Sequence, residues 1–299
     1  MDDCPAGVTT GDALRWAARN LALADVASPR LDAELLLGHA LGASRTDLQL
    51  RWTECLTPEA AHALTALIRR RAAREPLAYI TGRRPFYDLD LYVAPGVLVP
   101  RPETEGLVEE VLAWAQKWRA AGRRPLRIAD VGTGSGAIAV TLARHLPEAT
   151  VAATDLSPAA LAVAAENVAR HGLGDRMRLV RADLLAGVGG PLDVIAANPP
   201  YVPSARLADL QPEIREHEPR EALDGGADGL DVIRRLLPQA AERLAAPGLL
   251  VVEIDETHGE AVRRLARQAF PHADIAIRQD LAGLDRLLRV SLDNRSESE

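Results

Sequence analysis

The stretch ADVGTGSGAIA, residues 129 to 139, joins an apolar run to a helical pattern through a turn rich in glycine. A turn of this kind between a strand and a helix allows a ligand to approach the backbone closely, and the N-terminus of the helix faces that ligand. We therefore predict a strand over 127–131, a helix over 136–145 and a ligand-binding turn between them. The residues of the turn are Gly132, Thr133, Gly134, Ser135 and Gly136.

More apolar runs of strand length follow, and helical patterns separate them. The strand candidates are 127–131, 150–154, 177–180, 192–196 and 249–254. The helical stretches between them include 136–145, 158–171 and 231–245. This alternation is typical of an α/β fold, in which helices cover both faces of a parallel sheet. The last two runs, 273–277 and 286–292, leave no room for a helix between them, so we expect these strands to be antiparallel.

The first part of the chain has only helical patterns. Apolar residues recur three and four positions apart in 9–24, 28–42 and 57–75. Ser28 and Thr57 each precede a proline, as an N-cap residue does, and Gly42 is a typical helix stop. These features predict a small all-helical domain.

Residues 85–100 alternate apolar and polar side chains around a Pro-Gly turn, which is typical of a hairpin. We expect a helical domain over residues 1–78, a hairpin linker over 79–104 and an α/β domain over 105–299. An arginine-rich run, 69–74, lies near the end of the helical domain, and we expect it to form a solvated helix face.

Composition narrows the class of protein. The chain has 299 residues, 47% of them hydrophobic, which is enough for a large core. No run approaches the roughly 18 to 20 apolar residues of a membrane span, and the N-terminus is acidic, so we expect a cytoplasmic protein without membrane contact. Two cysteines and scattered histidines predict no metal site. A net charge of -7 disfavours a nucleic-acid-binding surface.

Acidic residues follow the next two strand candidates. Asp155 lies 19 residues after Gly136, where a carboxylate can accept hydrogen bonds from ribose hydroxyls. Asp183 follows the third strand, where it could hold the exocyclic amine of an adenine. An adenosine-containing cofactor is therefore expected at this edge of the sheet. The glycine spacing also satisfies the G-x-G-x-x-A pattern of dinucleotide-binding proteins, so NAD stays open at this point.

The stretch LDVIAANPPYV, residues 192 to 202, ends a strand candidate in an amide, two prolines and a phenol. Asn198 can accept a hydrogen bond through its side-chain oxygen, and Pro199 and Pro200 offer a rigid carbonyl without an N–H. Tyr201 adds a flat face on which a planar group could stack. Two acceptors and a flat face suit a planar nitrogen, which methyl transfer requires and hydride transfer does not. S-adenosyl-L-methionine is therefore favoured over NAD.

Taken together, these motifs resemble those of the class I methyltransferases that modify a glutamine side chain of peptide chain release factors. The resemblance covers nearly the whole chain. It rests on residues 74–105, on GTGSGAIA, on NPPYV and on HEPREALDGGADGLDVIRRLL at 217–237. A related family, which methylates a glutamine of a ribosomal protein, shares Asn-Pro-Pro-Tyr but differs at PRPETE, VGTGSG and ALDGG.

The resemblance implies a doubly wound, Rossmann-like sheet, S-adenosyl-L-methionine as cofactor and a release factor as protein partner, with no direct role for nucleic acid. The helical domain would recognise the protein substrate. Cofactor contacts would fall on the glycine turn and on Asp155, Asp183, Leu184 and Asn198. Substrate contacts would fall on Asn198, Pro199, Pro200 and Tyr201, of which Asn198, Pro199 and Tyr201 would be catalytic.

The sequence departs from the family at three positions. Leu184 stands where an aromatic residue is frequent, Asp255 where glycine is usual and His258 where glutamine is usual. Three other functions remain open from the residues. They are a ribosomal-protein glutamine methyltransferase, an adenine-N6 methyltransferase acting on a flipped base, and an NAD-dependent oxidoreductase that uses the glycine turn alone.

Overall fold

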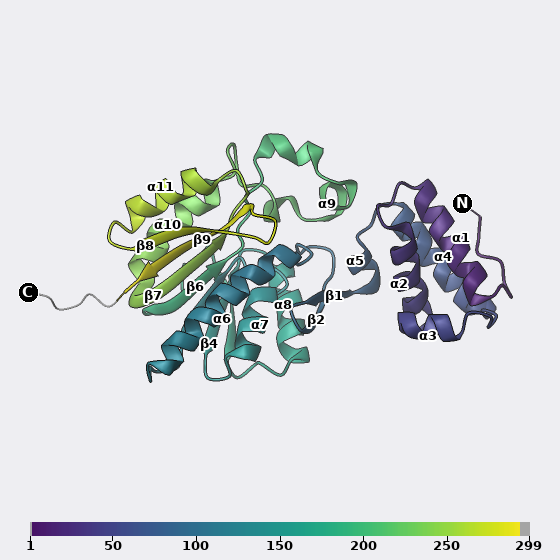
Figure 1. The fold of residues 1–299 in the computed structure, drawn as a ribbon, viewed down its shortest axis with the longest axis horizontal. Coiled ribbons are helices and arrows are strands. Elements are labelled where there is room, and N and C mark those ends of the chain that lie inside the picture. The colour runs from purple at the N-terminus through teal and green to yellow at the C-terminus, as the bar shows by residue number, and fades with distance from the viewer. Residues whose placement is uncertain (1, 294–299) are drawn as a thin grey trace, which may run out of the picture. The chain divides into compact units, whose positions relative to one another are not determined.

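The computed structural model describes residues 2 to 293, which form two compact units. Within the described residues, one unit comprises 2–83 together with Gln211–His217. The other comprises Arg84–Leu210 and 218–293. Figure 1 shows the ribbon and labels most of its helices and strands. The short segment 211–217 therefore belongs to the first unit, although the chain on either side of it belongs to the second.

The first unit, which we call the helical unit, is built from helices around one apolar core. The helices are α1 (Thr10–Leu23), α2 (Pro29–Leu41), α3 (Arg45–Leu50), α4 (Pro58–Ala72), α5 (Leu77–Thr81) and α9 (Pro212–His217). Their buried side chains include Leu21, Leu36, Leu37, Leu64 and Ile68. The predicted all-helical character of this part of the chain is confirmed, but α3, α5 and α9 are too short for the periodicity of the sequence to indicate.

The predicted helix ends are confirmed at all three positions, although one of the two N-cap residues makes no side-chain bond. Thr57 accepts a hydrogen bond from the backbone N–H of Ala60, as an N-cap residue does. Gly42 ends α2 in the left-handed conformation, at φ 58°. Ser28 precedes α2 but makes no side-chain capping bond.

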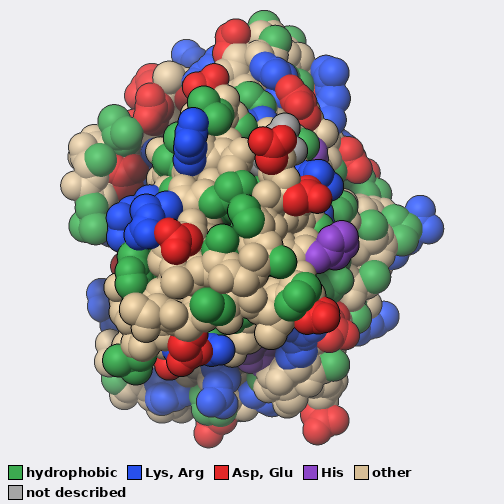
Figure 2. Space-filling model, turned by 90° about the vertical axis from the view of Figure 1, so that its right-hand side faces the viewer, with side chains coloured by type: hydrophobic (Ala, Val, Ile, Leu, Met, Phe, Trp, Pro, Cys, Tyr) green, Lys and Arg blue, Asp and Glu red, His purple; other side chains and the backbone are tan. Residues whose placement is uncertain are grey.

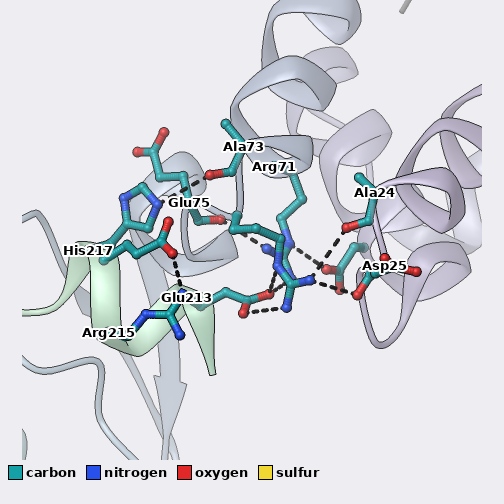
Figure 3. Close-up of polar contacts among 11 residues, drawn as sticks. Ala24, Asp25, Arg71, Ala73, Glu75, Glu213, Arg215 and His217 are labelled. Carbon is teal, nitrogen blue, oxygen red and sulfur yellow. Dashed lines mark hydrogen bonds and ion pairs between the residues drawn. The ribbon is translucent and has the colours of Figure 1, made fainter. Parts of the chain in front are cut away.

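The helix α9 is held in the helical unit by ion pairs (Figure 3). Glu213 lies 2.8 Å from Arg71 and 2.7 Å from Arg74, and Arg71 also lies 2.7 Å from Asp32. Hydrogen bonds from Arg74 and Arg71 outweigh the effect of burial and lower the pKa of Glu213 to about 2. The expectation of a solvated arginine face is therefore wrong for Arg71, which is 6% exposed.

The second unit, which we call the α/β unit, contains a seven-stranded sheet in the order β5-β4-β3-β6-β7-β9-β8. The five strands from β5 to β7 are parallel, whereas β9 is antiparallel to both β7 and β8. The strands are β3 (Arg127–Val131), β4 (Thr150–Asp155), β5 (Met177–Arg181), β6 (Leu192–Ala197), β7 (Leu244–Glu253), β8 (Asp274–Gln279) and β9 (Asp285–Leu292). The predicted doubly wound sheet and its antiparallel end are confirmed.

Helices cover both faces of this sheet (Figure 1). Side chains of α6 (Glu105–Ala120), α7 (Ala137–His145) and α8 (Pro158–Arg170) pack in one core with Ile128 of β3. Side chains of α10 (Asp231–Arg243) and α11 (Gly259–Ala269) pack in a second core with Ala129 of the same strand. Neighbouring residues of a strand face opposite sides, so β3 contributes to both cores and is buried on both faces. Sequence periodicity did not indicate α11.

A hairpin is present near the predicted place, as a two-stranded sheet of β1 (Arg83–Phe86) and β2 (Leu89–Tyr92). The predicted Pro-Gly turn is wrong, because the hairpin turns at residues 87–88 and Pro95-Gly96 follows the second strand. Among the described residues, no helix is both long enough and apolar enough to span a membrane.

Gly136 illustrates why the turn before α7 needs glycine. Its φ is +83°, and an added Cβ would lie 3.3 Å from Val140 Cγ2 and 3.4 Å from the Cβ of Ala164 in α8. We expect Gly136→Ala to lower the free energy of unfolding by about 1 to 2 kcal/mol, because a side chain is strained in this conformation. Urea titration followed by circular dichroism measures the change.

Gly106→Ala is the matched control, because Gly106 lies in α6 and an added Cβ there meets no atom within 4 Å. That variant should be as stable as the native protein or more stable by about 0.5 to 1 kcal/mol. Equal stability of Gly136→Ala and the native protein would contradict the assignment of strain to Gly136.

Candidate active site

A cavity lies in the α/β unit at the carboxyl ends of the parallel strands, where open α/β sheets bind ligands. It brings together most of the residues that the sequence singled out. The predicted site residues that line it are Gly132, Thr133, Gly134, Ser135, Asp155, Asp183, Leu184, Asn198, Pro199 and Pro200. Gly136 and Tyr201 are not among the lining residues.

The glycine turn is fixed by the neighbouring strand β4. The backbone N–H groups of Gly132 and Thr133 both donate to the carbonyl of Thr154, each at 2.9 Å. Gly134 donates its N–H to Oδ2 of Asp155 at 2.9 Å. Gly132 and Gly134 have φ values of +71° and +55°, and an added Cβ on Gly134 would meet no atom within 4 Å. The turn thus presents open backbone to the cavity.

Asp155, the last residue of β4, is held in place by backbone donors. Its Oδ2 accepts from Gly134, and its Oδ1 accepts from the N–H of Ser157 at 2.9 Å. A carboxylate offers about four lone-pair positions, so acceptor capacity remains on the cavity side. The residue is therefore oriented before any ligand arrives.

Asp130 is a buried carboxylate that the sequence analysis missed. Its Oδ2 accepts from the hydroxyl of Thr133 at 2.6 Å and from the N–H of Ala139 at 3.2 Å. Burial raises the pKa of Asp130 to about 7. Asp130 thus bonds both the glycine-rich loop and the first helical turn of α7, and so it stabilises the loop that lines the cavity. An acidic residue within an otherwise apolar strand was the signal for it.

The third strand brings Asp183 and Leu184 to the cavity. Asp183 forms an ion pair with Arg235 of α10, and Arg235 itself lines the cavity. The other carboxylate oxygen of Asp183, Oδ1, is buried and has no hydrogen-bond partner among the described residues. Leu184 has a positive φ of 54° and also lines the cavity. Arg235 could not be singled out from the sequence, because it is one of several arginines on an amphipathic helix.

Asn198 follows β6 and takes part in a partly buried polar network. Its Nδ2 donates to the hydroxyl oxygen of Thr104 at 3.1 Å, and Thr104 donates to Oε2 of Glu253 at 2.7 Å. The hydroxyl of Tyr201 donates to Oε1 of the same carboxylate at 3.1 Å. Burial raises the pKa of Glu253, although the hydrogen bonds from Thr104 and Tyr201 act in the opposite direction. We refer to Asn198, Thr104, Glu253 and Tyr201 as the amide network.

Two members of this network were not assigned a role from the sequence. Thr104 belongs to the short 3-10 helix Pro102–Thr104 and lines the cavity. Glu253 is the last residue of β7 and is 1% exposed. A charged residue at the end of an apolar strand was the available signal for Glu253. Arg101, by contrast, does not line the cavity and is paired with Glu218 at 2.8 Å.

The segment 223–229 packs against the chain that follows Tyr201 and forms backbone hydrogen bonds with it. Val202 exchanges backbone hydrogen bonds of 2.9 Å with Leu223 and Gly225. A Cβ on Gly229 would lie 2.3 Å from the carbonyl oxygen of Tyr201, so only glycine allows this approach. The N-cap residue of α10 is Leu230, and no side chain caps the helix.

Asp255 and His258, which depart from the family pattern, lie in the turn before α11. Oδ1 of Asp255 accepts from the backbone N–H of Thr257 at 3.0 Å, and Oδ2 lies 3.2 Å from Arg206. His258 is the N-cap residue of α11 and is 6% exposed. Neither residue lines the cavity. Both therefore belong to the turn before α11 and not to the cavity wall.

Comparisons with known proteins agree with this architecture. A family model described as PrmC N-terminal domain matches residues 12–82, and one described as Methyltransferase small domain matches residues 118–214. The release factor glutamine methyltransferase of Moorella thermoacetica is 48% identical over 93% of this chain and 97% of its own length. The release factor glutamine methyltransferase of Geobacter sulfurreducens is 42% identical over 96% of this chain and 98% of its own length.

A solved structure, the hMettl16 catalytic domain in complex with the MAT2A 3'UTR hairpin 6, has a TM-score of 0.53 and 16% sequence identity. The match covers 80% of this chain and 83% of that one, and at this identity it supports the methyltransferase fold alone. The relatives of similar length, and the two matched domains, decide the family. This chain belongs to the release factor glutamine methyltransferases, a family of S-adenosylmethionine-dependent enzymes.

Proposed function

We propose that the protein transfers a methyl group from S-adenosyl-L-methionine to the side-chain amide nitrogen, N5, of the glutamine in the Gly-Gly-Gln motif of peptide chain release factors. The proposal rests on the amide of Asn198, which lies beside Pro199 in the wall of the cavity and gives its N–H to Thr104. That bond leaves the Asn198 oxygen available as an acceptor. An acceptor pair in a cofactor-binding cavity suits an NH₂ group that is to be methylated.

The residues of the cavity fit the cofactor. The open backbone of Gly134 accommodates a closely approaching ligand, and Asp155 has free acceptor capacity for ribose hydroxyls. Asp183 lines the same cavity, and its carboxylate would accept a hydrogen bond from the exocyclic amine of adenine. When bound, S-adenosyl-L-methionine supplies an electrophilic methyl group on a sulfonium sulfur.

The acceptor nitrogen of a glutamine is a weak nucleophile, because its lone pair is delocalised into the carbonyl group. Hydrogen bonds from its two hydrogens to Asn198 Oδ1 and to the Pro199 carbonyl would weaken this delocalisation. They would also stabilise the positive charge that grows on the nitrogen, and both effects are strongest in the transition state. The methylated amide cation is acidic enough to lose its proton to water, so no dedicated base is required.

The same acceptor pair could hold an adenine amine, but the charge of the protein favours a protein substrate. The net charge is -7. Figure 2, which views the side of the helical unit, shows positive and negative side chains interspersed with hydrophobic ones. A strand-binding surface needs a continuous positive patch to neutralise phosphates.

We also propose that the helical unit recognises the release factor. The chain leaves the α/β unit after Leu210, nine residues beyond Tyr201, and contributes Gln211–His217 to the helical unit. The segment that carries the acceptor pair is thus continuous with that unit. Arg71 and Arg74 are engaged in internal ion pairs, so the arginine run is a poor candidate for the contact. Leu31 and Leu35 are 43% and 36% exposed and lie one turn apart on α2. They are better candidates for the contact with the release factor.

Asp155→Ala should weaken S-adenosyl-L-methionine binding by about 1 to 3 kcal/mol, through loss of charged hydrogen bonds. Isothermal titration calorimetry measures the affinity. Asp155→Asn, which keeps one acceptor oxygen, should lose less. Asp175→Ala removes an exposed carboxylate outside the cavity and should bind normally. An unchanged affinity of a folded Asp155→Ala variant would remove Asp155 from the cofactor site.

Asn198→Ala should retain most of the affinity for the cofactor but lose about 100-fold or more in turnover, as expected when a transition-state hydrogen bond is lost. Single-turnover methylation with radiolabelled cofactor measures the rate, and calorimetry on the same sample measures the binding. Nearly normal turnover would exclude a direct role of Asn198 in holding the amide.

Incubation of the protein with S-adenosyl-L-methionine and a bacterial release factor should add one methyl group to the Gly-Gly-Gln glutamine, detected by peptide mass spectrometry. The double variant Leu31→Ser/Leu35→Ser should raise the KM for the release factor while leaving cofactor affinity unchanged. Leu281→Ser, at an exposed leucine of the α/β unit, is the matched control.

Methylation of nucleic acid or of a ribosomal protein, with the release factor unmodified, would contradict the proposed substrate. An unchanged KM in the double leucine variant would leave the substrate assignment intact and exclude this face of α2 as the contact.

A further inference from the structure

We infer that Thr104 and Glu253 are positioning residues that fix the side-chain amide of Asn198, so that its oxygen and not its NH₂ group faces the acceptor nitrogen. The inference rests on the proposed function, because it concerns the hydrogen bond that Asn198 would accept from the glutamine. Neither residue would touch the reacting atoms through this role.

The three residues meet because of the sheet. β6 and β7 are parallel neighbours, and Ala197 pairs with Val252, so Asn198 and Glu253 leave the sheet side by side. Thr104 comes from the 3-10 helix that precedes α6 and lies between them in the hydrogen-bond chain. Thr104 is 4% exposed and Glu253 is 1% exposed. Water therefore has little access to the bonds that join them.

The direction of the hydrogen bonds follows from the number of protons. A threonine hydroxyl has one proton, and Thr104 gives it to Oε2 of Glu253 at 2.7 Å. The Thr104 oxygen can then only accept, so the Asn198 group that faces it must be the NH₂ group. A reversed amide would place the Asn198 oxygen against lone pairs of the Thr104 oxygen. The carboxylate of Glu253 thus determines, through Thr104, which end of the Asn198 amide faces away.

Tyr201 completes the arrangement from the other side of the carboxylate. Its hydroxyl donates to Oε1 of Glu253 at 3.1 Å, and burial raises the pKa of Tyr201, so that the phenol keeps its proton. Both oxygens of Glu253 therefore accept from hydroxyl donors. No donor to Oδ1 of Asn198 is found among residues 2 to 293, which leaves that oxygen free for a substrate N–H.

The test is a double-mutant cycle on methylation of the release factor. Thr104→Val keeps the shape of the side chain but removes the hydroxyl, and it should lower kcat about 10-fold. An effect of this size is typical of the coupling between contacting residues. The KM for the release factor should change less than twofold. In an Asn198→Ala background, Thr104→Val should change kcat less than twofold, because there is no amide left to orient.

Thr104→Ser keeps the hydroxyl and should retain kcat within twofold of the native protein. Thr141→Val is the matched control, since Thr141 is a fully buried threonine of the α/β unit whose hydroxyl bonds to the carbonyl of Ala137. It should leave kcat unchanged. Circular dichroism establishes that each variant is folded, and Thr104→Ala replaces Thr104→Val if the valine variant is not.

The inference is overturned if Thr104→Val leaves kcat unchanged, or if it lowers kcat by the same factor with and without Asn198. Those outcomes are distinct from a failure of the proposed function. If the proposed function failed, the native protein itself would leave the Gly-Gly-Gln glutamine unmethylated.

Discussion

The strands of a doubly covered parallel sheet can carry almost no unpaired polar groups, and this constraint determines where the chemistry of the protein lies. All six residues of β6 are buried, and Asn198 is the first residue after that strand. Two acidic residues do lie in buried strand positions near the cavity, Asp130 and Glu253, and each accepts two hydrogen bonds from the segments that follow or cover the strands. A buried carboxylate is costly unless it is bonded in this way. The carboxylates therefore stabilise the loops that bind them, and those loops form the cavity.

This constraint also explains which features the sequence reveals. Strand ends are visible because an apolar run stops at a glycine, an aspartate or an asparagine, and Gly132, Asp155 and Asn198 were found for that reason. Contacts between distant segments are not visible in this way. Thr104 and Glu253 lie 149 positions apart, and Glu213 lies 142 positions from Arg71. The segment that contains each residue does not identify its partner, and only the tertiary fold places the two side by side.

The short helix α9 shows the same limit at the level of domains. Its sequence lies well inside the predicted α/β domain, yet its packing belongs to the helical unit. The ion pairs of Glu213 have a definite dependence on pH. The pKa of Glu213 in the folded protein is about 2, below its ordinary value, so the stabilisation is complete above the unfolded pKa and is lost only as the pH falls towards 2. At neutral pH the anchoring of α9 does not depend on small changes in proton concentration.

The two proposed acceptors for the glutamine differ in how they can be held. The carbonyl of Pro199 lies between two proline rings, which restrict the backbone on both sides, so its direction follows from the chain itself. The amide of Asn198 has an oxygen and a nitrogen of nearly equal size, so packing alone does not distinguish its two orientations. Only hydrogen bonds of known direction can do so. A rigid backbone suffices for the first acceptor, whereas the second requires a buried group that accepts from Thr104, and this gives Glu253 a physical reason to stand at the end of an apolar strand.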